Sequence, residues 1–308
     1  MGKAIRVAYG ETLVELGQVN DKIVVFDADL ANATMTSKFK EKFPDRFYDL
    51  GIAECNMMGA AAAFAREGLT PFASTFAIFG AGRAFEIIRN SIAYTNLNVK
   101  IALTHAGLSV GEDGGSHQSV EDIALMRSLP NMTVIVPCDA IEARKAVIAA
   151  SEMKGPVYIR LARPVVDDIT NVDTEFEIGK ANVLKEGTDV CIISTGLMVS
   201  VSLNAAYELE KQGISTSVVD MHTIKPIDKK LILEMNKNKK MIITVEEHSI
   251  IGGLGSAVAE VLAGNPGAKF AMVGINDKFG HSGLPDQLFE EYGLTAENVV
   301  NTVIKNIK

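Results

Sequence analysis

Short apolar runs and helically spaced apolar residues alternate along the chain. An apolar run bounded by turn residues predicts a strand buried on both faces of a parallel sheet. In the first half of the chain such runs cover residues 22–28, 46–50, 71–75, 99–103, 133–136 and 155–164. Helical spacing or a capping sequence predicts helices over residues 4–16, 54–66, 83–94 and 139–150. This alternation is typical of an open α/β sheet, and we expect Gly17 to end the first helix.

The alternation stops near residue 164 and then resumes. Residues 164–179 are irregular and rich in acids. After them, the pattern predicts strands over 190–195, 215–220, 241–246 and 270–275, and helices over 199–212, 256–263 and 296–307. Because a chain of 308 residues is at the size limit of a single core, we expect two open α/β domains with mostly parallel sheets. Their expected bounds are residues 1–165 and 181–308, with a linker over 166–180.

Composition narrows the possible functions. The chain has 30 Lys and Arg against 38 Asp and Glu, a net charge of −8, which disfavours nucleic acid or an anionic membrane as the main partner. Cys55, Cys138 and Cys191 are odd in number and widely spaced, which indicates buried thiols in a reducing compartment and no metal-ligand motif. No apolar run is long enough to span a bilayer and no signal peptide is recognisable, so we expect a cytoplasmic protein.

A glycine-rich polar loop follows the predicted strand 99–103. It runs from Thr104 to Asp122 and contains His105, Asp113 and His117. Glycine allows close approach of backbone to a ligand, and open α/β sheets place ligands beyond the carboxyl ends of their strands. The loop is therefore our first candidate site. The alternative is an ordinary surface loop with two solvated histidines.

Other charged residues also stand at ends of predicted elements. Asp27 and Asp29 follow one strand, Arg163 ends another, and Glu54 begins a helix. At strand ends, carboxylates are site candidates, and an arginine there could bind a phosphate through two hydrogen bonds. Each also has a structural interpretation: a turn cap for one aspartate, a surface salt bridge for Arg163, and a dipole-complementing first-turn acid for Glu54.

A second glycine motif lies in the second predicted domain. Gly252 and Gly255 follow the predicted strand 241–246 and open a helix. The three-glycine dinucleotide fingerprint is absent, and no acid stands at the distance expected for ribose binding. Nucleotide binding is therefore not favoured here.

Several segments together resemble a known family. GIAECNMMGAAAAFAREGLTPFASTF, THAGLSVGEDGGSHQSVED and PVYIRLAR resemble the pyrimidine-binding domain of transketolase. VDMHTIKPID and VEEHSIIGGLGSAVAE resemble that enzyme's C-terminal domain. The family's diphosphate-binding domain carries a GDG motif with two later asparagines that hold a metal, and this sequence lacks it. The chain thus resembles the C-terminal subunit of a split, two-chain transketolase.

The resemblance implies a cofactor and residues that bind it. The cofactor is thiamine diphosphate, with Mg²⁺ held by a partner chain. Glu54 is implied as the carboxyl that bonds the pyrimidine ring and promotes loss of the thiazolium proton. Phe76 and Phe79 are implied as the aminopyrimidine pocket, with Asp29 close to the cofactor. Phe76 and Phe79 also share a helical face, so a plain core role is the alternative.

The resemblance also implies a substrate channel. His105, Asp113 and His117 would contact the hydroxyls of the sugar, and Arg163 would bind its phosphate. Two family features are unmatched: a phosphate-binding serine has no counterpart in Ala31–Thr34, and Gly82 stands where an aromatic residue is expected.

The implied function is transfer of a two-carbon ketol unit from a ketose phosphate to an aldose phosphate. The implied partner is an N-terminal subunit with the diphosphate-binding domain, in an assembly of two chains of each kind. Three alternatives share the fold: the beta subunit of a 2-oxo acid dehydrogenase decarboxylase, half of a deoxyxylulose phosphate synthase, and a non-catalytic scaffold subunit. The first lacks a GEDG-x-x-HQ string, the second has a different string after related motifs, and the retained Glu54, His105 and His117 argue against the third.

Overall fold

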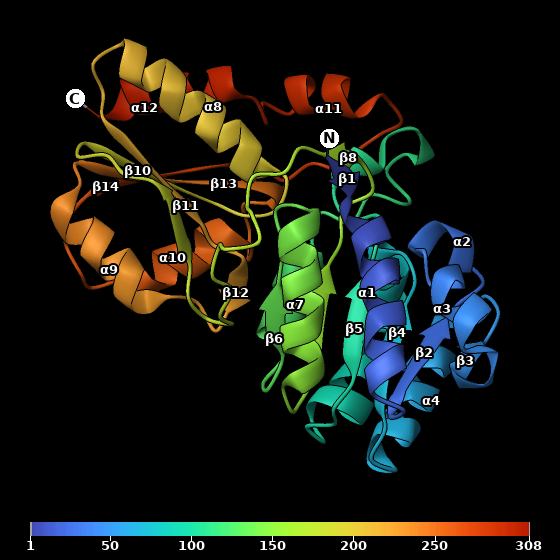
Figure 1. Cartoon of the computed structure of the whole chain (residues 1–308). Coiled ribbons are helices and arrows are strands. Elements are labelled where there is room, and N and C mark those ends of the chain that lie inside the picture. Colours follow the sequence, from blue (N-terminus) through green and yellow to red (C-terminus); the bar gives the residue numbers. More distant parts are fainter. Residues whose placement is uncertain (1, 308) are drawn as a thin grey trace.

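The computed structural model describes residues 2–307 and contains two α/β domains side by side (Figure 1). The first domain has a seven-stranded sheet in the order β12-β6-β7-β5-β4-β2-β3, and the second a five-stranded sheet in the order β14-β13-β10-β11-β9. Within these sheets β12 and β9 run antiparallel to their neighbours and the other pairs are parallel. The expected fold class is confirmed.

Three groups of elements build the first domain. Its strands are β1 (Lys3–Ala4), β2 (Ile23–Asp27), β3 (Phe47–Asp49), β4 (Thr70–Ser74), β5 (Lys100–Leu103), β6 (Thr133–Ile135), β7 (Val157–Arg160) and β8 (Val165–Val166). Its α-helices are α1 (Ile5–Val19), α2 (Ala31–Thr34), α3 (Ser37–Lys42), α4 (Glu54–Arg66), α5 (Phe85–Ile87), α6 (Asp122–Ser128) and α7 (Ala140–Glu152). Four further helical segments are η1 (Pro44–Arg46), η2 (Ile78–Arg83), η3 (Ile88–Ala93) and η4 (Leu108–Asp113).

The second domain repeats the alternation of strands and helices. Its strands are β9 (Asn182–Lys185), β10 (Val190–Ser194), β11 (Thr216–Asp220), β13 (Met241–Ser249) and β14 (Lys269–Ile275). Its helices are α8 (Met198–Lys211), α9 (Lys229–Asn238), α10 (Leu254–Leu262), α11 (Pro285–Glu291) and α12 (Ala296–Asn306). In Figure 1, α8 and α12 lie on one side of this sheet and α9 and α10 on the other.

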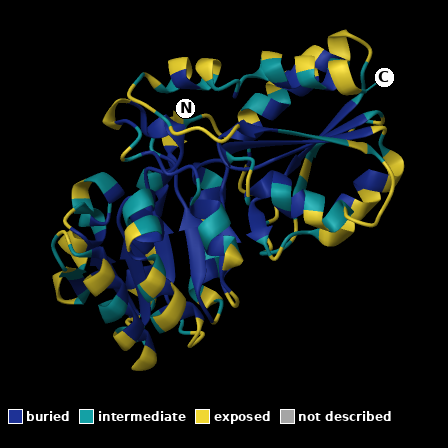
Figure 2. Ribbon diagram, turned by 180° about the vertical axis from the view of Figure 1, so that it is seen from behind, coloured by how far each residue is buried: buried dark blue, intermediate teal, exposed yellow. Residues whose placement is uncertain are grey.

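Alternate residues of the buried strands feed two apolar cores. Val25 of β2 packs in the core that contains α1 and α7, while its neighbours Val24 and Phe26 pack in the core that contains α4. Both cores continue into the second domain. Figure 2 shows the strands largely buried and the exposed residues on outer helix surfaces. No helix in residues 2–307 is long and apolar enough to cross a membrane.

A strand from the second half of the chain completes the first sheet. β12 (Thr223–Lys225) pairs with β6, so the boundary expected near residues 166–180 is crossed by a later strand. The expected linker begins within β8, which pairs with β1, and continues as irregular chain as far as β9. The two domains therefore share a sheet edge as well as a covalent connection.

Two local predictions were wrong. Helix α1 continues past Gly17 to Val19, because this glycine serves packing: a Cβ there would lie 2.6 Å from the ring of Phe43. The helix predicted over 83–94 is divided between the π-helical segments η2 and η3 and the single turn of α5. By contrast, the predicted N-cap is present: Asp139 accepts a hydrogen bond from the Glu142 amide. The Glu142 carboxylate accepts from the Cys138 amide, one residue before the cap, so the capping box is incomplete.

Candidate functional site

The candidate residues lie beyond the carboxyl ends of the parallel strands. Asp29 follows β2, Phe76 and Phe79 follow β4, His105 follows β5, and Arg163 follows β7. Parallel strands bring these ends to one edge, as the sequence predicted. Glu54 reaches the same edge as the first residue of α4.

Glu54 is buried and forms an ion pair that sequence analysis missed. Its Oε2 accepts a hydrogen bond from the Arg83 guanidinium at 3.0 Å. The Glu54 side chain is 3% exposed and that of Arg83 is 55% exposed, so the pair joins the interior to the surface. Arg83 also lies over the ring of Phe79, with its guanidinium carbon 5.3 Å from the ring centroid. Arg83 belongs to a segment that we predicted as a regular helix, where spacing gave no sign of a site.

An aromatic layer connects this carboxylate with the glycine-rich loop. Phe76 and Phe79 are stacked with centroids 5.9 Å apart. His105 covers Phe76 at 3.9 Å, and His117 meets Phe79 edge-on at 5.3 Å. The structure therefore brings together four residues from two distant segments of sequence. Together they form an aromatic layer, and Arg83 connects this layer to the Glu54 carboxylate.

His105 is held in a fixed position and is uncharged near neutral pH. Its backbone has φ +57°, in the left-handed region, and its Nδ1 lies 2.9 Å from the Thr104 hydroxyl. Burial lowers the pKa of His105 to about 3, with further lowering by the positive charges of Arg6 and Arg163. A neutral imidazole can donate from one nitrogen and accept at the other. His117 is only partly buried, and its Nδ1 lies 3.0 Å from the Ser116 hydroxyl.

Arg163 lines a pocket with charged walls beside the glycine-rich loop. Its guanidinium contacts the Val110 carbonyl, lies 3.5 Å from a Glu112 carboxylate oxygen and 3.8 Å from one of Asp113. The side chain is 35% exposed. Arg163 thus has acidic neighbours and also an open side. Asp113, expected to contact substrate, is one of those neighbours.

Arg6 is a second cation that lines this pocket, and sequence analysis did not single it out. It donates to the Ala33 carbonyl at 2.7 Å and to the Arg163 carbonyl at 3.3 Å. Burial, followed by the charge of Arg163, lowers its pKa. Arg6 lies in the first turns of α1, and an arginine in an amphipathic helix ordinarily indicates a solvated face. No sequence signal distinguished it.

The two aspartates at the end of β2 and just beyond it have different roles. Asp27 is buried and accepts hydrogen bonds from the Leu30 amide and the Thr34 and Thr36 hydroxyls at 2.7–2.8 Å. It is therefore the turn cap that we considered for one of the pair. Asp29 is exposed, and within residues 2–307 its carboxylate forms no hydrogen bond or ion pair. The structure does not bring Asp29 into the aromatic layer.

The second domain holds the glycine-rich loop in place. Glu247 of β13 accepts a 2.5 Å hydrogen bond from the Ser109 amide. Gly107, at φ +85°, lies against the same carboxylate, where a Cβ would come within 2.4 Å. Gln118 donates to the His281 carbonyl at 3.0 Å. Acids inside a buried strand carried no recognised sequence signal for this role.

The helix end at Gly252–Gly255 is already occupied by a side chain. Glu246 accepts hydrogen bonds from the Leu254 and Gly255 amides at 2.7 and 2.8 Å. A carboxylate at a helix N-terminus takes the place that a phosphate would use. This geometry agrees with the low expectation of nucleotide binding at this glycine motif.

The chain matches known proteins along both domains. Residues 1–167 match the family model described as transketolase, pyrimidine binding domain, and residues 179–299 match transketolase, C-terminal domain. The chain belongs to the transketolase family. A Methanocaldococcus jannaschii protein named as a transketolase C-terminal section is 49% identical over 99% of this chain and 97% of its own length. Human transketolase is 39% identical over 97% of this chain, which corresponds to 48% of the human protein.

A solved structure extends the match. It is titled a split-gene transketolase, inactive β4 tetramer, and is 54% identical with a TM-score of 0.91 over 100% of this chain and 99% of that one. The predicted resemblance to the C-terminal subunit of a split transketolase is confirmed. Transketolases depend on thiamine diphosphate. Its aminopyrimidine would take the position that Arg83 has over the Phe79 ring, and Glu54 has one oxygen that no group in residues 2–307 bonds.

Proposed function

We propose that this chain catalyses transfer of a two-carbon ketol unit from a ketose phosphate to an aldose phosphate, as one subunit of a two-chain transketolase. The observation that carries the proposal is the series of contacts from the buried Glu54 carboxylate through Arg83 and Phe79 to His117 in the polar loop. These contacts hold a ring-binding acid and hydroxyl-binding imidazoles near one another.

The roles of the chain's own residues follow from that geometry. Phe76 and Phe79 orient the aminopyrimidine ring, and Glu54 holds a proton at a ring nitrogen once Arg83 shifts from its carboxylate. When bound, thiamine diphosphate supplies the nucleophilic carbon for the two-carbon unit. Neutral His105 and partly exposed His117 bond sugar hydroxyls and move protons at the reacting end.

We assign binding of the substrate's phosphate to the pocket lined by Arg163 and Arg6. Arg163, with Arg6 beside it, would bind the remote phosphate through charge-assisted hydrogen bonds. Asp113 would then exchange its contact with Arg163 for a substrate hydroxyl. Asp29 remains a proposed neighbour of the cofactor, reached only when the partner is bound.

The partner supplies what these residues do not. We propose an N-terminal transketolase subunit that binds the diphosphate through Mg²⁺, in an assembly of two chains of each kind. A split-gene relative is titled an inactive tetramer of β chains, which supports inactivity of the chain alone.

The test is an activity assay with and without the partner. The purified chain is mixed with thiamine diphosphate, Mg²⁺, a ketose phosphate donor and an aldose phosphate acceptor. We expect turnover only after the N-terminal subunit is added. Steady turnover by the single chain would refute the partner requirement, and no turnover with any ketose phosphate in the reconstituted pair would refute the reaction.

A further inference from the structure

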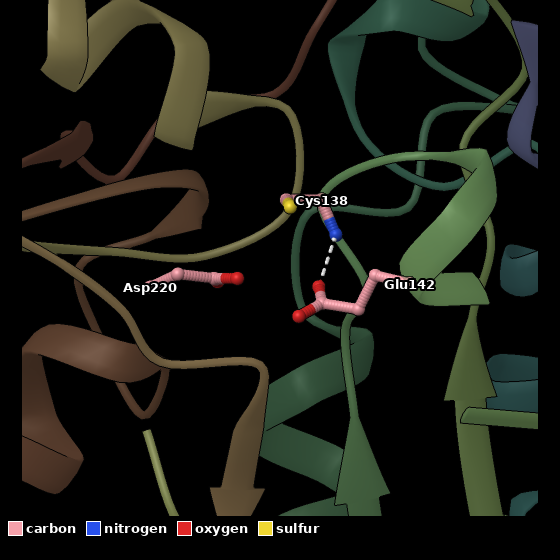
Figure 3. Close-up of side chains that lie close together, drawn as sticks. All are labelled: Cys138, Glu142 and Asp220. Carbon is pink, nitrogen blue, oxygen red and sulfur yellow. Dashed lines mark hydrogen bonds between the residues drawn. The ribbon is translucent and has the colours of Figure 1, made fainter. Parts of the chain in front are cut away.

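Three buried side chains, one thiol and two carboxyl groups, lie close together in the interior between the two domains. Cys138 follows β6, Glu142 is in the first turn of α7, and Asp220 is the last residue of β11. Figure 3 shows Asp220 directed from the second domain toward the other two. One ligand atom from each residue lies within 4.8 Å of the others, and all three residues are buried. None of the three belongs to the aromatic layer described above.

The polar atoms of this cluster are incompletely bonded. One oxygen of Glu142 accepts a hydrogen bond from the Cys138 amide at 2.8 Å. The other oxygen of Glu142 and both oxygens of Asp220 are buried without a hydrogen-bond partner. None of the ion pairs formed within residues 2–307 includes either carboxylate. Buried carboxylates without compensation are strongly unfavourable, so either a proton or a metal ion is needed at this point.

The donor set indicates which species. A proton shared between Glu142 and Asp220, with the Cys138 thiol hydrogen-bonded to the carboxylates, is the alternative that the test below distinguishes from a metal ion. A metal ion uses all three groups. Mg²⁺ and Ca²⁺ prefer oxygen ligands alone, whereas Zn²⁺ accepts a thiolate together with carboxylates. Asp220, with both oxygens unbonded, can contribute one or two ligand atoms.

We propose that Cys138, Glu142 and Asp220 bind one zinc-class divalent ion that links the first domain to the second. Burial raises the pKa of the Cys138 thiol, so the thiol carries its proton when no metal is present. Metal binding then forms a metal–sulfur bond and releases that proton to solvent. Two carboxylates and one thiolate surround a divalent cation, and the buried charge falls to −1. No thiamine diphosphate or partner chain enters this proposal.

Metal content of the purified full chain tests the site. The chain is expressed in zinc-supplemented medium, dialysed against metal-free buffer, and analysed for metal by mass spectrometry. We expect about one zinc per chain. Cys138→Ala and Asp220→Asn should each lose that zinc, whereas Cys191→Ala, which changes a buried thiol outside the cluster, should retain it. Circular dichroism establishes that each variant is folded.

Cobalt gives a readout that does not depend on the variants. In wild-type chain produced with Co²⁺, a thiolate ligand adds a sulfur-to-cobalt charge-transfer absorption, which we expect to observe. Absence of bound zinc and of this absorption in the wild-type chain would overturn the proposal and leave a shared proton as the neutralising species. Equal zinc in wild-type, Cys138→Ala and Asp220→Asn chains would also overturn it. Because these readouts require no catalysis, they stand whether or not the ketol transfer is confirmed.

Discussion

At the scale of single residues, Glu54 is subject to two opposing electrostatic requirements. Glu54 stands at a helix N-terminus and against Arg83, both of which stabilise a negative carboxylate. Its proposed role needs the same carboxylate to hold a proton on a bound ring. The Arg83 side chain is exposed over half its surface and can therefore move aside without disturbing the core. We infer that the ion pair belongs to the chain before it binds cofactor.

Replacing Glu54 tests this role directly. Glu54→Gln keeps the shape of the side chain but removes the shareable proton. We expect a loss of about a hundredfold or more in kcat of the reconstituted enzyme, as for other acid–base groups, with an unchanged circular dichroism spectrum. Glu67→Gln, at the exposed end of the same helix, should remain fully active. Wild-type turnover in Glu54→Gln would return Glu54 to a dipole-complementing acid.

Arg163 should affect recognition of the substrate's phosphate more than the chemical step. If it binds the remote phosphate, Arg163→Ala should lower kcat/KM by about tenfold to a hundredfold for a phosphorylated acceptor, which corresponds to roughly 1.5–3 kcal/mol for a charge-assisted hydrogen bond. An unphosphorylated aldehyde acceptor should be little affected. His117→Ala should instead lower kcat/KM for both acceptors. Equal losses on both acceptors for Arg163→Ala would assign this arginine to its salt bridges with Glu112 and Asp113.

At the level of elements, the glycine-rich loop depends on a strand of the other domain. Gly107 has φ +85° and ψ −173°, a conformation that essentially only glycine adopts, and it lies against Glu247. We expect Gly107→Ala to lower both stability and activity. Gly68→Ala is the matched control, because Gly68 also has positive φ but has no atom within 4 Å of its Cβ position. It should cost about 1–2 kcal/mol of backbone strain with unchanged kcat.

Measuring kcat alongside the thermal midpoint separates these two effects. If Gly107→Ala and Gly68→Ala lose equal stability and Gly107→Ala keeps full kcat, the contact with Glu247 does not position the loop.

The carboxyl that anchors this loop should make stability depend on pH. Burial raises the pKa of Glu247 to about 7, from an ordinary value of 4.5. A raised pKa in the folded state stabilises fully below about pH 4.5, and this stabilisation is lost as pH rises toward 7. Glu247→Gln should therefore be relatively more stable than wild type at pH 8 than at pH 4.5, by up to roughly 3 kcal/mol. Thermal midpoints at both values measure this, with Glu290→Gln as an exposed control.

A constant difference between wild type and Glu247→Gln across this range would show that Glu247 has an ordinary pKa in the folded chain. The Ser109 amide should keep its partner in the variant, because the glutamine oxygen still accepts a hydrogen bond.

Sequence patterns predicted elements well wherever burial and periodicity coincide. The apolar runs gave the parallel strands of both sheets but not the antiparallel strand β9, and their shared carboxyl edge placed His105 and Arg163 at one side of the domain. They could not give Arg83, because its role arises from the path of an irregular helical segment. They also could not give β12, which is three residues long and pairs with a strand nearly ninety residues earlier in the chain.

Long-range contacts set the remaining limits. The bond from Glu247 to Ser109 joins positions 138 residues apart, and no local pattern reports such a pair. Likewise, the cluster of Cys138 and Glu142 could not be recognised from these two residues alone. Its companion Asp220 arrives from another domain.

At the scale of the whole molecule, an apolar side chain close to Glu54 in the chain is exposed to solvent. Ile52, two residues before Glu54, is 76% exposed. In the proposed enzyme the cofactor extends from this chain's Glu54 and aromatic layer to the partner's diphosphate site. The partner must therefore cover the surface around Glu54. An exposed apolar residue beside a buried carboxylate is suited to such an interface, where it excludes water from the carboxylate.

Ile52→Asp should therefore weaken association with the N-terminal subunit. A charge placed in a desolvated apolar contact costs more than 1.4 kcal/mol, which is at least about tenfold in Kd. Val19→Asp is the matched control: Val19 is 82% exposed, but it ends α1 at the opposite edge of the sheet. It should leave Kd unchanged. Titrating each variant with the subunit gives Kd. At saturating subunit the kcat of Ile52→Asp should recover, because the substitution leaves Glu54 and the aromatic layer in place. An unchanged Kd for Ile52→Asp would place the partner on another surface.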